Sequence, residues 1–199
     1  MRVRAERLGI FGGTFDPPHV GHLVAALEVR HALALHRVLL MVANEPWQKV
    51  GTRSISPADC RLGMVEAAVE GVEGLEAGAL EIERGGPSYT VDTLQTLATD
   101  DPDGERFLIL GADAAAGLET WERAEAVPDL ATLVLVDRPG LPAPPPPPGW
   151  KLERVEMPRL DVSSTDLRQR AADGRPLAFL TPPAVVSFIE QRRLYRGRP

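Results

Sequence analysis

Short apolar runs alternate with segments of helical periodicity along most of this chain, and that alternation limits the fold more than any other feature. Strands are predicted over residues 8–11, 37–42, 75–83, 107–111, 132–136 and 152–157. Helices are predicted over 20–35 and 56–70, from Thr90 or Asp92, from Ser163 or Ser164 to Gly174, and from 181–182 into the basic end of the chain. Strands that alternate with helices form βαβ units, and right-handed crossovers place helices on both sheet faces. We predict an α/β fold with an open, mostly parallel sheet.

The length of the chain and one proline-rich stretch set the predicted domain organisation. A chain of 199 residues can bury one sizeable core, so we predict a single domain over 1–199. Residues 139–149 are rich in proline, which lacks a backbone N–H and fixes φ. We predict an exposed polyproline-II linker there, either a plain spacer or a ligand for an aromatic groove. A helical subregion follows over 163–199.

Composition and charge exclude several classes of protein. No apolar run approaches the roughly 20 residues needed to cross a bilayer, so no membrane partner is expected. The formal net charge is −6, which disfavours non-specific nucleic-acid binding because that rests on many Lys and Arg. The single cysteine, Cys60, cannot form an internal disulfide, and a reducing cytoplasm is the expected location. The basic tail 192–198 is interpreted as a solvated helix end, with anion binding as the alternative.

The strongest functional signal is the stretch 12–22, Gly-Gly-Thr-Phe-Asp-Pro-Pro-His-Val-Gly-His. It lies where the first strand meets the first helix, and ligands bind at the carboxyl ends of strands in such sheets. Gly12 and Gly13 let backbone N–H groups approach an anion, and the helix N-terminus adds partial positive charge. His19 and His22 are three residues apart and therefore project from the same helical face. Two imidazoles there can donate hydrogen bonds to phosphate oxygens.

Each part of this stretch also has a simpler interpretation. A glycine pair after a strand is needed for many tight turns, and a histidine near a helix start is usually a polar surface residue. His19 and His22 could bind a metal, but no third ligand stands at motif spacing, so no protein metal site is predicted. The whole string requires all of these coincidences at once, which favours a nucleotide-binding function.

The string resembles the signature of the nucleotidyltransferase superfamily that carries a His-x-Gly-His motif, and its fuller form resembles the bacterial nicotinate-nucleotide adenylyltransferases. Three further blocks, at 86–94, at 110–113 with Trp121, and at 163–168, are similar to blocks of that family. The His-x-Gly-His motif alone implies only nucleotidyl transfer and is similar to one in class I aminoacyl-tRNA synthetases. The Gly-Pro-Ser-Tyr-Thr block at 86–90 narrows the resemblance to the pyridine-nucleotide branch. The loop 43–49 departs from the proline- and histidine-containing loop commoner in the family.

The resemblance implies a Rossmann-like nucleotidyltransferase fold, and transfer of the adenylyl group of ATP, with Mg²⁺, to nicotinate mononucleotide in NAD biosynthesis. Trp121 would stack on the pyridine ring, Thr90 would donate to the nicotinate carboxylate, and Asp113 would hold a ribose hydroxyl. The implied site residues are His19, His22 and Arg168 for catalysis; Gly12, Gly13, Thr14, Phe15, Gly111, Asp113, Ser164 and Thr165 for ATP; and Asp16, Asn44, Trp47, Lys49, Tyr89, Thr90 and Trp121 for the nicotinate nucleotide.

Two other functions stay open from the sequence. One is nucleotidyl transfer to a different phosphorylated acceptor such as phosphopantetheine, although that branch is not expected to carry Tyr89-Thr90 and Trp121. The other is a nucleotide sensor that has lost turnover, which would not need His19, His22, Ser164 and Arg168 together. The expected partners are ATP and nicotinate mononucleotide, and homo-oligomerisation is left open.

Overall fold

The computed structural model describes residues 5–46, 54–137 and 145–196. The chain divides into two compact units, each made of three separate segments. The first unit comprises residues 1–12, 25–40 and 89–159, and the second comprises 13–24, 41–88 and 160–199. The single domain over 1–199 stays a prediction. Of the predicted linker, residues 139–144 lie outside the described residues, and 145–149 form no helix or strand.

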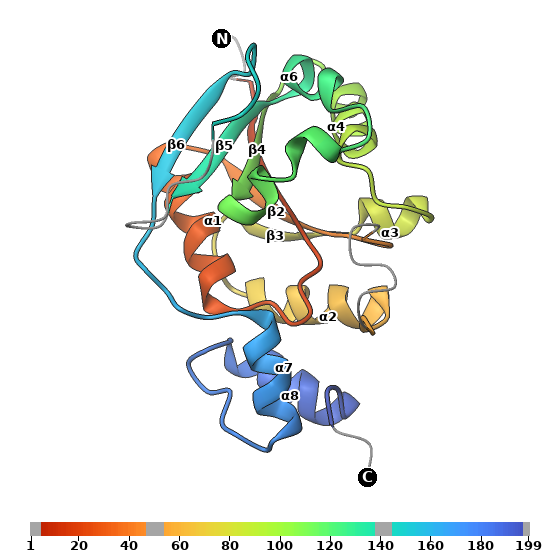
Figure 1. Ribbon diagram of the computed structural model, residues 1–199, viewed down its shortest axis with the longest axis vertical. Helices are drawn as coiled ribbons and strands as arrows, with labels where there is room; N and C mark the ends of the chain where they lie inside the picture. Colours follow the sequence, from red (N-terminus) through yellow and green to blue (C-terminus); the bar gives the residue numbers. More distant parts are fainter. Residues whose placement is uncertain (1–4, 47–53, 138–144, 197–199) are drawn as a thin grey trace. The chain divides into compact units, whose positions relative to one another are not determined.

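Six strands form one sheet in the order β3-β2-β1-β4-β5-β6 (Figure 1). They are β1 (Arg7–Gly13), β2 (Arg37–Val42), β3 (Leu75–Gly78), β4 (Glu105–Gly111), β5 (Thr132–Asp137) and β6 (Leu152–Glu156). The pairs β1/β4, β4/β5 and β5/β6 are parallel. The chain proceeds from β1 toward one edge and then returns to β4 and the other edge. This reversal creates the switch point beside β1 at which open α/β sheets bind ligands.

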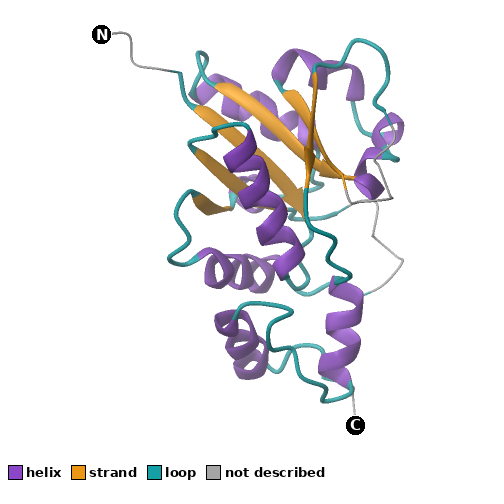
Figure 2. Cartoon of the chain, turned by 90° about the vertical axis from the view of Figure 1, so that its left-hand side faces the viewer, coloured by secondary structure: helices purple, strands orange, loops and turns teal. Residues whose placement is uncertain are grey.

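The helices of the first unit cover this sheet. They are the C-terminal part of α1 (Val20–Ala32), α4 (Thr90–Asp100), α5 (Ala112–Ala115) and α6 (Val127–Leu130), with the 3₁₀ turns η2 (Leu118–Thr120) and η3 (Ala124–Ala126). Right-handed crossovers place α1 and α4 on opposite faces because their connections run in opposite directions along the sheet. Figure 2 shows helices in front of and behind the strands. The prediction of a Rossmann-like α/β fold is confirmed.

Strand side chains supply the core of the first unit. Ile10, Leu108 and Leu133 are at most 1% exposed, as expected for parallel strands buried on both faces. A side chain at Gly9 would stand 2.9 Å from Val38 and 3.1 Å from Ile109. Glycine at this position therefore lets the neighbouring layers pack closely on β1.

The second unit is built on three helices that pack together: α2 (Ala58–Val69), α7 (Ser164–Ala172) and α8 (Pro183–Arg192). Their core consists of Met64, Ala68, Leu167, Leu177, Val185 and Ile189. Ser163 caps α7, because its side chain accepts a hydrogen bond from the Asp166 N–H at 3.1 Å. Within the described ranges, every helix is too short or too polar to span a bilayer.

One predicted element is wrong in part. The strand predicted over 75–83 ends at Gly78, and residues 80–84 form the short helix α3 (Leu80–Arg84). The alternation of Leu80 and Ile82 with glutamates suggested a strand, but leucine, glutamate and arginine all favour a helix. Gly85 then ends α3 with a φ of 72°, a conformation that glycine adopts without strain.

Candidate active site

The loop that joins β1 to α1, residues 13–18, is hereafter the signature loop. Its side chains are turned inward: Thr14, Phe15 and Asp16 are 8%, 2% and 1% exposed. A side chain at Gly13 would meet the Phe15 ring at 2.8 Å, so this position requires glycine. Phe15 itself has a φ of 50°, which is unfavourable for an aromatic residue. The loop is thus a tight, internally packed turn with one fixed shape.

His19 and His22 lie against each other at the start of α1. Their rings stack with centroids 3.7 Å apart and planes 21° apart, which confirms that they share one face. The His19 carbonyl accepts the His22 N–H at 2.9 Å, and the His19 N–H donates to Nδ1 of His22 at 3.1 Å. Because Nδ1 accepts, the proton of the His22 ring is on Nε2. In this geometry Nε2 is the donor atom of the His22 ring.

Gly21 has a packing role between these two histidines. A side chain there would stand 3.1 Å from the His19 ring and 3.2 Å from Val162. The sequence suggested that glycine leaves room for a ligand. The structure adds a second reason: the His19 ring occupies the space that a side chain at residue 21 would need.

The N-terminus of α7 is fastened to the signature loop. Ser164 Oγ donates to the Pro17 carbonyl at 2.8 Å, and Arg168 donates to the Asp16 carbonyl at 2.7 Å. Arg168 also donates to Thr165 Oγ1 at 3.0 Å. The predicted phosphate-binding residues of α7 and the signature loop are therefore brought together within the second unit. Their contacts with phosphate stay a prediction.

Sequence reasoning missed Arg61, which fastens the signature loop from within the protein. It is 1% exposed, and its guanidinium donates to four backbone carbonyls. The acceptors are Ser56 at 2.9 Å, Thr14 at 3.1 Å, Ala43 at 2.5 Å and Asn44 at 2.8 Å. A signal was present, because an arginine on the face of α2 that also carries Met64, Val65 and Ala68 is unusual.

Sequence reasoning also missed Tyr195, which lies in the basic tail after α8. Its hydroxyl donates to Oδ1 of Asp16 at 2.7 Å, and Oδ2 accepts from the Ser56 N–H at 3.5 Å. Burial, and then the neighbouring Asp16 carboxylate, raise the pKa of Tyr195 above its ordinary value of 10.0. The phenol therefore stays protonated and donates. No local pattern in the sequence indicated this contact.

Asn44 lies in a second loop that belongs to the predicted acceptor site. Its side chain donates to the Gly86 carbonyl at 2.9 Å, and its N–H donates to Ser88 Oγ at 2.8 Å. The loop after β2 and the block 86–88 are thus joined within the second unit. Trp47 and Lys49, the other residues predicted from this loop, lie outside the described residues.

The remaining predicted residues belong to the first unit. Gly12 and Gly111 lie at the carboxyl ends of the adjacent strands β1 and β4, and a Cβ atom added at either would meet no heavy atom of the described residues within 4 Å. Asp113 lies in the first turn of α5. The acceptor residues are Tyr89, which caps α4, Thr90, its first residue, and Trp121, which follows η2 and is half-buried. Their contacts with a nucleotide stay a prediction.

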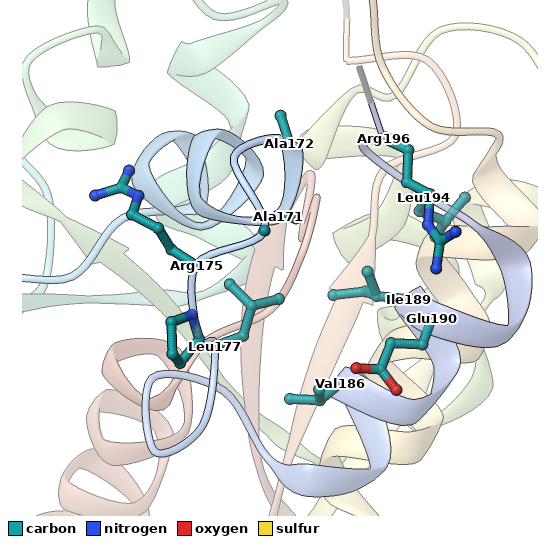
Figure 3. A pocket seen from close by; sticks show the side chains of 11 residues that line it. Ala171, Ala172, Arg175, Leu177, Val186, Ile189, Glu190, Leu194 and Arg196 are labelled. Carbon is teal, nitrogen blue, oxygen red and sulfur yellow. The ribbon is translucent and has the colours of Figure 1, made fainter. Parts of the chain in front are cut away.

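A separate cavity of about 530 Å³ lies in the second unit, between the end of α7 and α8 (Figure 3). Leu177, Val186 and Ile189 point into it, and Glu190 and Arg196 lie on its α8 side. None of the predicted site residues that the structure describes lines this cavity. In the part of the chain that the structure describes, no three His, Cys, Asp or Glu residues are placed to hold a metal ion.

Comparison with known proteins assigns this arrangement to a family. Residues 10–170 match the cytidylyltransferase-like family. A Roseiflexus protein named "probable nicotinate-nucleotide adenylyltransferase" is 48% identical over 95% of this chain and 98% of its own length. A protein of the same name from Thermus thermophilus is 42% identical over 96% of this chain and all of its own.

Among solved structures, the nicotinic acid mononucleotide adenylyltransferase of Plasmodium falciparum complexed with NaAD has a TM-score of 0.77 at 16% identity. The match covers 96% of this chain and 97% of that one, and at this identity it shows the fold alone. The fold, the stacked histidines at the start of α1 and the names of the two bacterial relatives are all consistent with one family. The chain belongs to the cytidylyltransferase-like nucleotidyltransferases, in the nicotinate-nucleotide adenylyltransferase family.

Proposed function

We propose that this chain transfers the adenylyl group of ATP to nicotinate mononucleotide, forming nicotinate adenine dinucleotide and pyrophosphate, a step of NAD biosynthesis. The observation that carries the proposal is the stacked pair His19 and His22 beside the buried residues Thr14, Phe15 and Asp16 of the signature loop. The relatives that share nearly the whole chain are named for the same activity.

The reaction is an in-line attack of the nucleotide's phosphate oxygen on the α-phosphorus of ATP. A phosphate is already an anionic nucleophile near neutral pH, so no strong general base is needed. Catalysis then depends on alignment of the reactants and on donors that meet the charge developing on the α-phosphate. We assign that task to the Nε2–H of His22, because its Nδ1 already accepts the His19 N–H.

The triphosphate would lie between two helix N-termini of the second unit. Backbone N–H groups of the signature loop, from Gly13 to Phe15, and the start of α1 offer partial positive charge. Ser164, Thr165 and Arg168 stand in the first two turns of α7, beside Asp16 and Pro17. ATP would enter as its Mg²⁺ complex, with the ion held by phosphate oxygens and water, because Mg²⁺ rarely uses an all-protein cage.

The acceptor is assigned to residues at the carboxyl edge of the sheet and in the loop after β2. Thr90 would donate to the nicotinate carboxylate and Trp121 would stack on the pyridine ring. An amide in place of that carboxylate would direct its N–H₂ at donors, and such a mismatch lowers binding and turnover. We therefore expect a strong preference for nicotinate over nicotinamide mononucleotide. Asp16, Asn44, Tyr89, Trp47 and Lys49 complete the proposed acceptor set, and the cytoplasm is the proposed location.

Release of pyrophosphate tests the proposal directly. The protein is incubated with Mg²⁺·ATP and nicotinate mononucleotide, and the controls replace the acceptor with nicotinamide mononucleotide, phosphopantetheine or buffer. Pyrophosphate and nicotinate adenine dinucleotide should appear together only in the first mixture. Release with phosphopantetheine instead would reassign the acceptor. ATP binding without release in any mixture would indicate a sensor and refute the enzymatic proposal.

A further inference from the structure

Four polar contacts from distant parts of the second unit converge on Asp16 and its neighbour Pro17, three of them on Asp16 itself. Its carboxylate accepts from the Tyr195 hydroxyl at 2.7 Å and from the Ser56 N–H at 3.5 Å. Its own carbonyl accepts from Arg168 at 2.7 Å, and the neighbouring Pro17 carbonyl accepts from Ser164 at 2.8 Å. An O–H donor to a carboxylate at this distance makes one of the stronger hydrogen bonds in proteins. The contact with Tyr195 joins residues 179 positions apart.

Tyr195, which makes this contact, has an unfavourable backbone conformation. Its φ is 60°, in the left-handed region that bulky residues avoid, whereas the φ of 52° at Arg193 belongs to the C-cap that ends α8. Such strain persists only where surrounding contacts compensate for it, and it is concentrated at functional sites. The compensating contacts of Tyr195 are the hydroxyl bond to Asp16 and the packing of its side chain on the helical core. The hydroxyl also lies 3.6 Å from Sδ of Met64.

The segment that carries Tyr195 has a different environment on each side. Leu194 and Arg196 line the cavity of about 530 Å³ (Figure 3). Tyr195, between them, donates to Asp16. One side of the segment thus faces a cavity rather than a packed layer, so packing alone fixes its position less well than it would in a filled core. The hydroxyl–carboxylate bond supplies the missing constraint.

We propose that Tyr195 is a positioning residue of the active site: by holding the Asp16 carboxylate it fixes the signature loop, and with it the alignment of His22 and Arg168 toward the reacting phosphates. The segment after α8 is then part of the catalytic structure and not only the end of a helix. This inference rests on the proposed function, because alignment matters only if phosphoryl chemistry takes place at the loop.

The hydroxyl can be removed while the ring stays. Tyr195→Phe keeps the ring on the helical core but removes the hydroxyl that donates to Asp16 at 2.7 Å. We expect kcat for dinucleotide formation to fall about tenfold to a hundredfold, since small misplacements of reacting groups have effects of that size. The KM for ATP should change by less than about threefold, because the loop backbone and α7 remain in place. Arg196→Gln, one residue along on the cavity side, serves as the matched control and should keep full activity.

A double-mutant cycle separates positioning from a general loss of stability. If Tyr195 acts through Asp16, then Tyr195→Phe should lower kcat little further in an Asp16→Asn background. If the effects of the two substitutions on kcat multiply independently, the inference is overturned. It is also overturned if kcat of Tyr195→Phe is within twofold of that of the unaltered protein, or if the Tyr195→Phe variant does not fold. If the unaltered protein forms no dinucleotide, the proposed function fails and this inference fails with it. An active protein with an indifferent Tyr195→Phe variant refutes the inference alone.

Discussion

Replacement of Arg61 by methionine should destabilise this protein more than any change at its surface. Arg61→Met keeps an apolar chain of similar length but removes a guanidinium that donates to four backbone carbonyls. Those carbonyls belong to the signature loop, the loop after β2 and the segment before α2. Arg61 is 1% exposed, and its bond to the Thr14 carbonyl is buried, whereas the other three bonds are partly buried.

The size of the effect follows from the number of acceptors that lose their donor. A buried acceptor left without a partner costs about 1–3 kcal/mol. Water can enter and satisfy some of these carbonyls. We therefore expect the free energy of unfolding to fall by about 4 kcal/mol, which is less than the summed cost of four unpaired carbonyls. For a chain of this size that corresponds to a fall in Tm of about 8–16 °C.

Thermal and urea unfolding followed by circular dichroism measure this loss. Arg61→Lys should be intermediate, because one ammonium keeps the charge but cannot reach all four acceptors. Arg170→Met is the matched control, since Arg170 makes an exposed pair with Asp166 at 2.7 Å, and such pairs contribute at most about 1 kcal/mol. A Tm for Arg61→Met within about 3 °C of the unaltered protein would show that the four bonds do not fasten the loop.

Three further outcomes follow from the same structure. His22→Ala should lower kcat by about 10²–10³, the usual effect of losing one preorganised donor. His22→Gln keeps an N–H near the Nε2 position and should therefore retain more activity than His22→Asn. The reverse order would contradict the assigned tautomer. Gly21→Ala should lower kcat at least tenfold at nearly unchanged Tm, because its methyl would stand 3.1 Å from the His19 ring and displace it. The Arg37 guanidinium lowers the pKa of Glu6 below its ordinary 4.5. Glu6→Gln should therefore be less stable than the unaltered protein above that pH. The difference in stability between the two proteins should vanish as the pH falls through the pKa of Glu6 in the folded state. The pair is about one-third exposed (34% and 35%), so we expect less than about 1 kcal/mol, measured as urea midpoints at pH 7 and pH 3.

The sequence predicted most of the helices and strands, because the apolar periodicity of each can be seen in consecutive residues. Strand β2 (Arg37–Val42) and the start of α7 lie where the sequence placed them, with Ser163 as the cap. The strand predicted over 75–83 failed where two weak signals competed, because Leu80 and Ile82 alternate as in a strand among residues that prefer a helix. Propensity decided the outcome once Gly78 ended β3.

The candidate site was predictable only to the extent that its residues are neighbours in the chain. His19 and His22 are three positions apart, so helical geometry alone brings their rings to one face. Arg61 and Tyr195 reach the signature loop from 47 and 179 positions away. Contacts of that kind arise from the packing of α2 and α8 together, which no window of sequence contains.

The distribution of buried polar residues explains why the signature loop needs such distant support. Seven polar or charged residues are buried in the described part of the chain. Thr14, Asp16 and His19 stand in or next to the loop, and Arg61 and Thr181 donate hydrogen bonds to its carbonyls. Burying polar groups opposes folding unless each finds a partner, so a fold selected for stability alone would not gather five of them around one turn. A catalyst that works by alignment requires donors that do not move as charge develops. Polar groups that bond only in one geometry impose that requirement more strictly than apolar packing can. We therefore expect the buried network around the signature loop to contribute to catalysis.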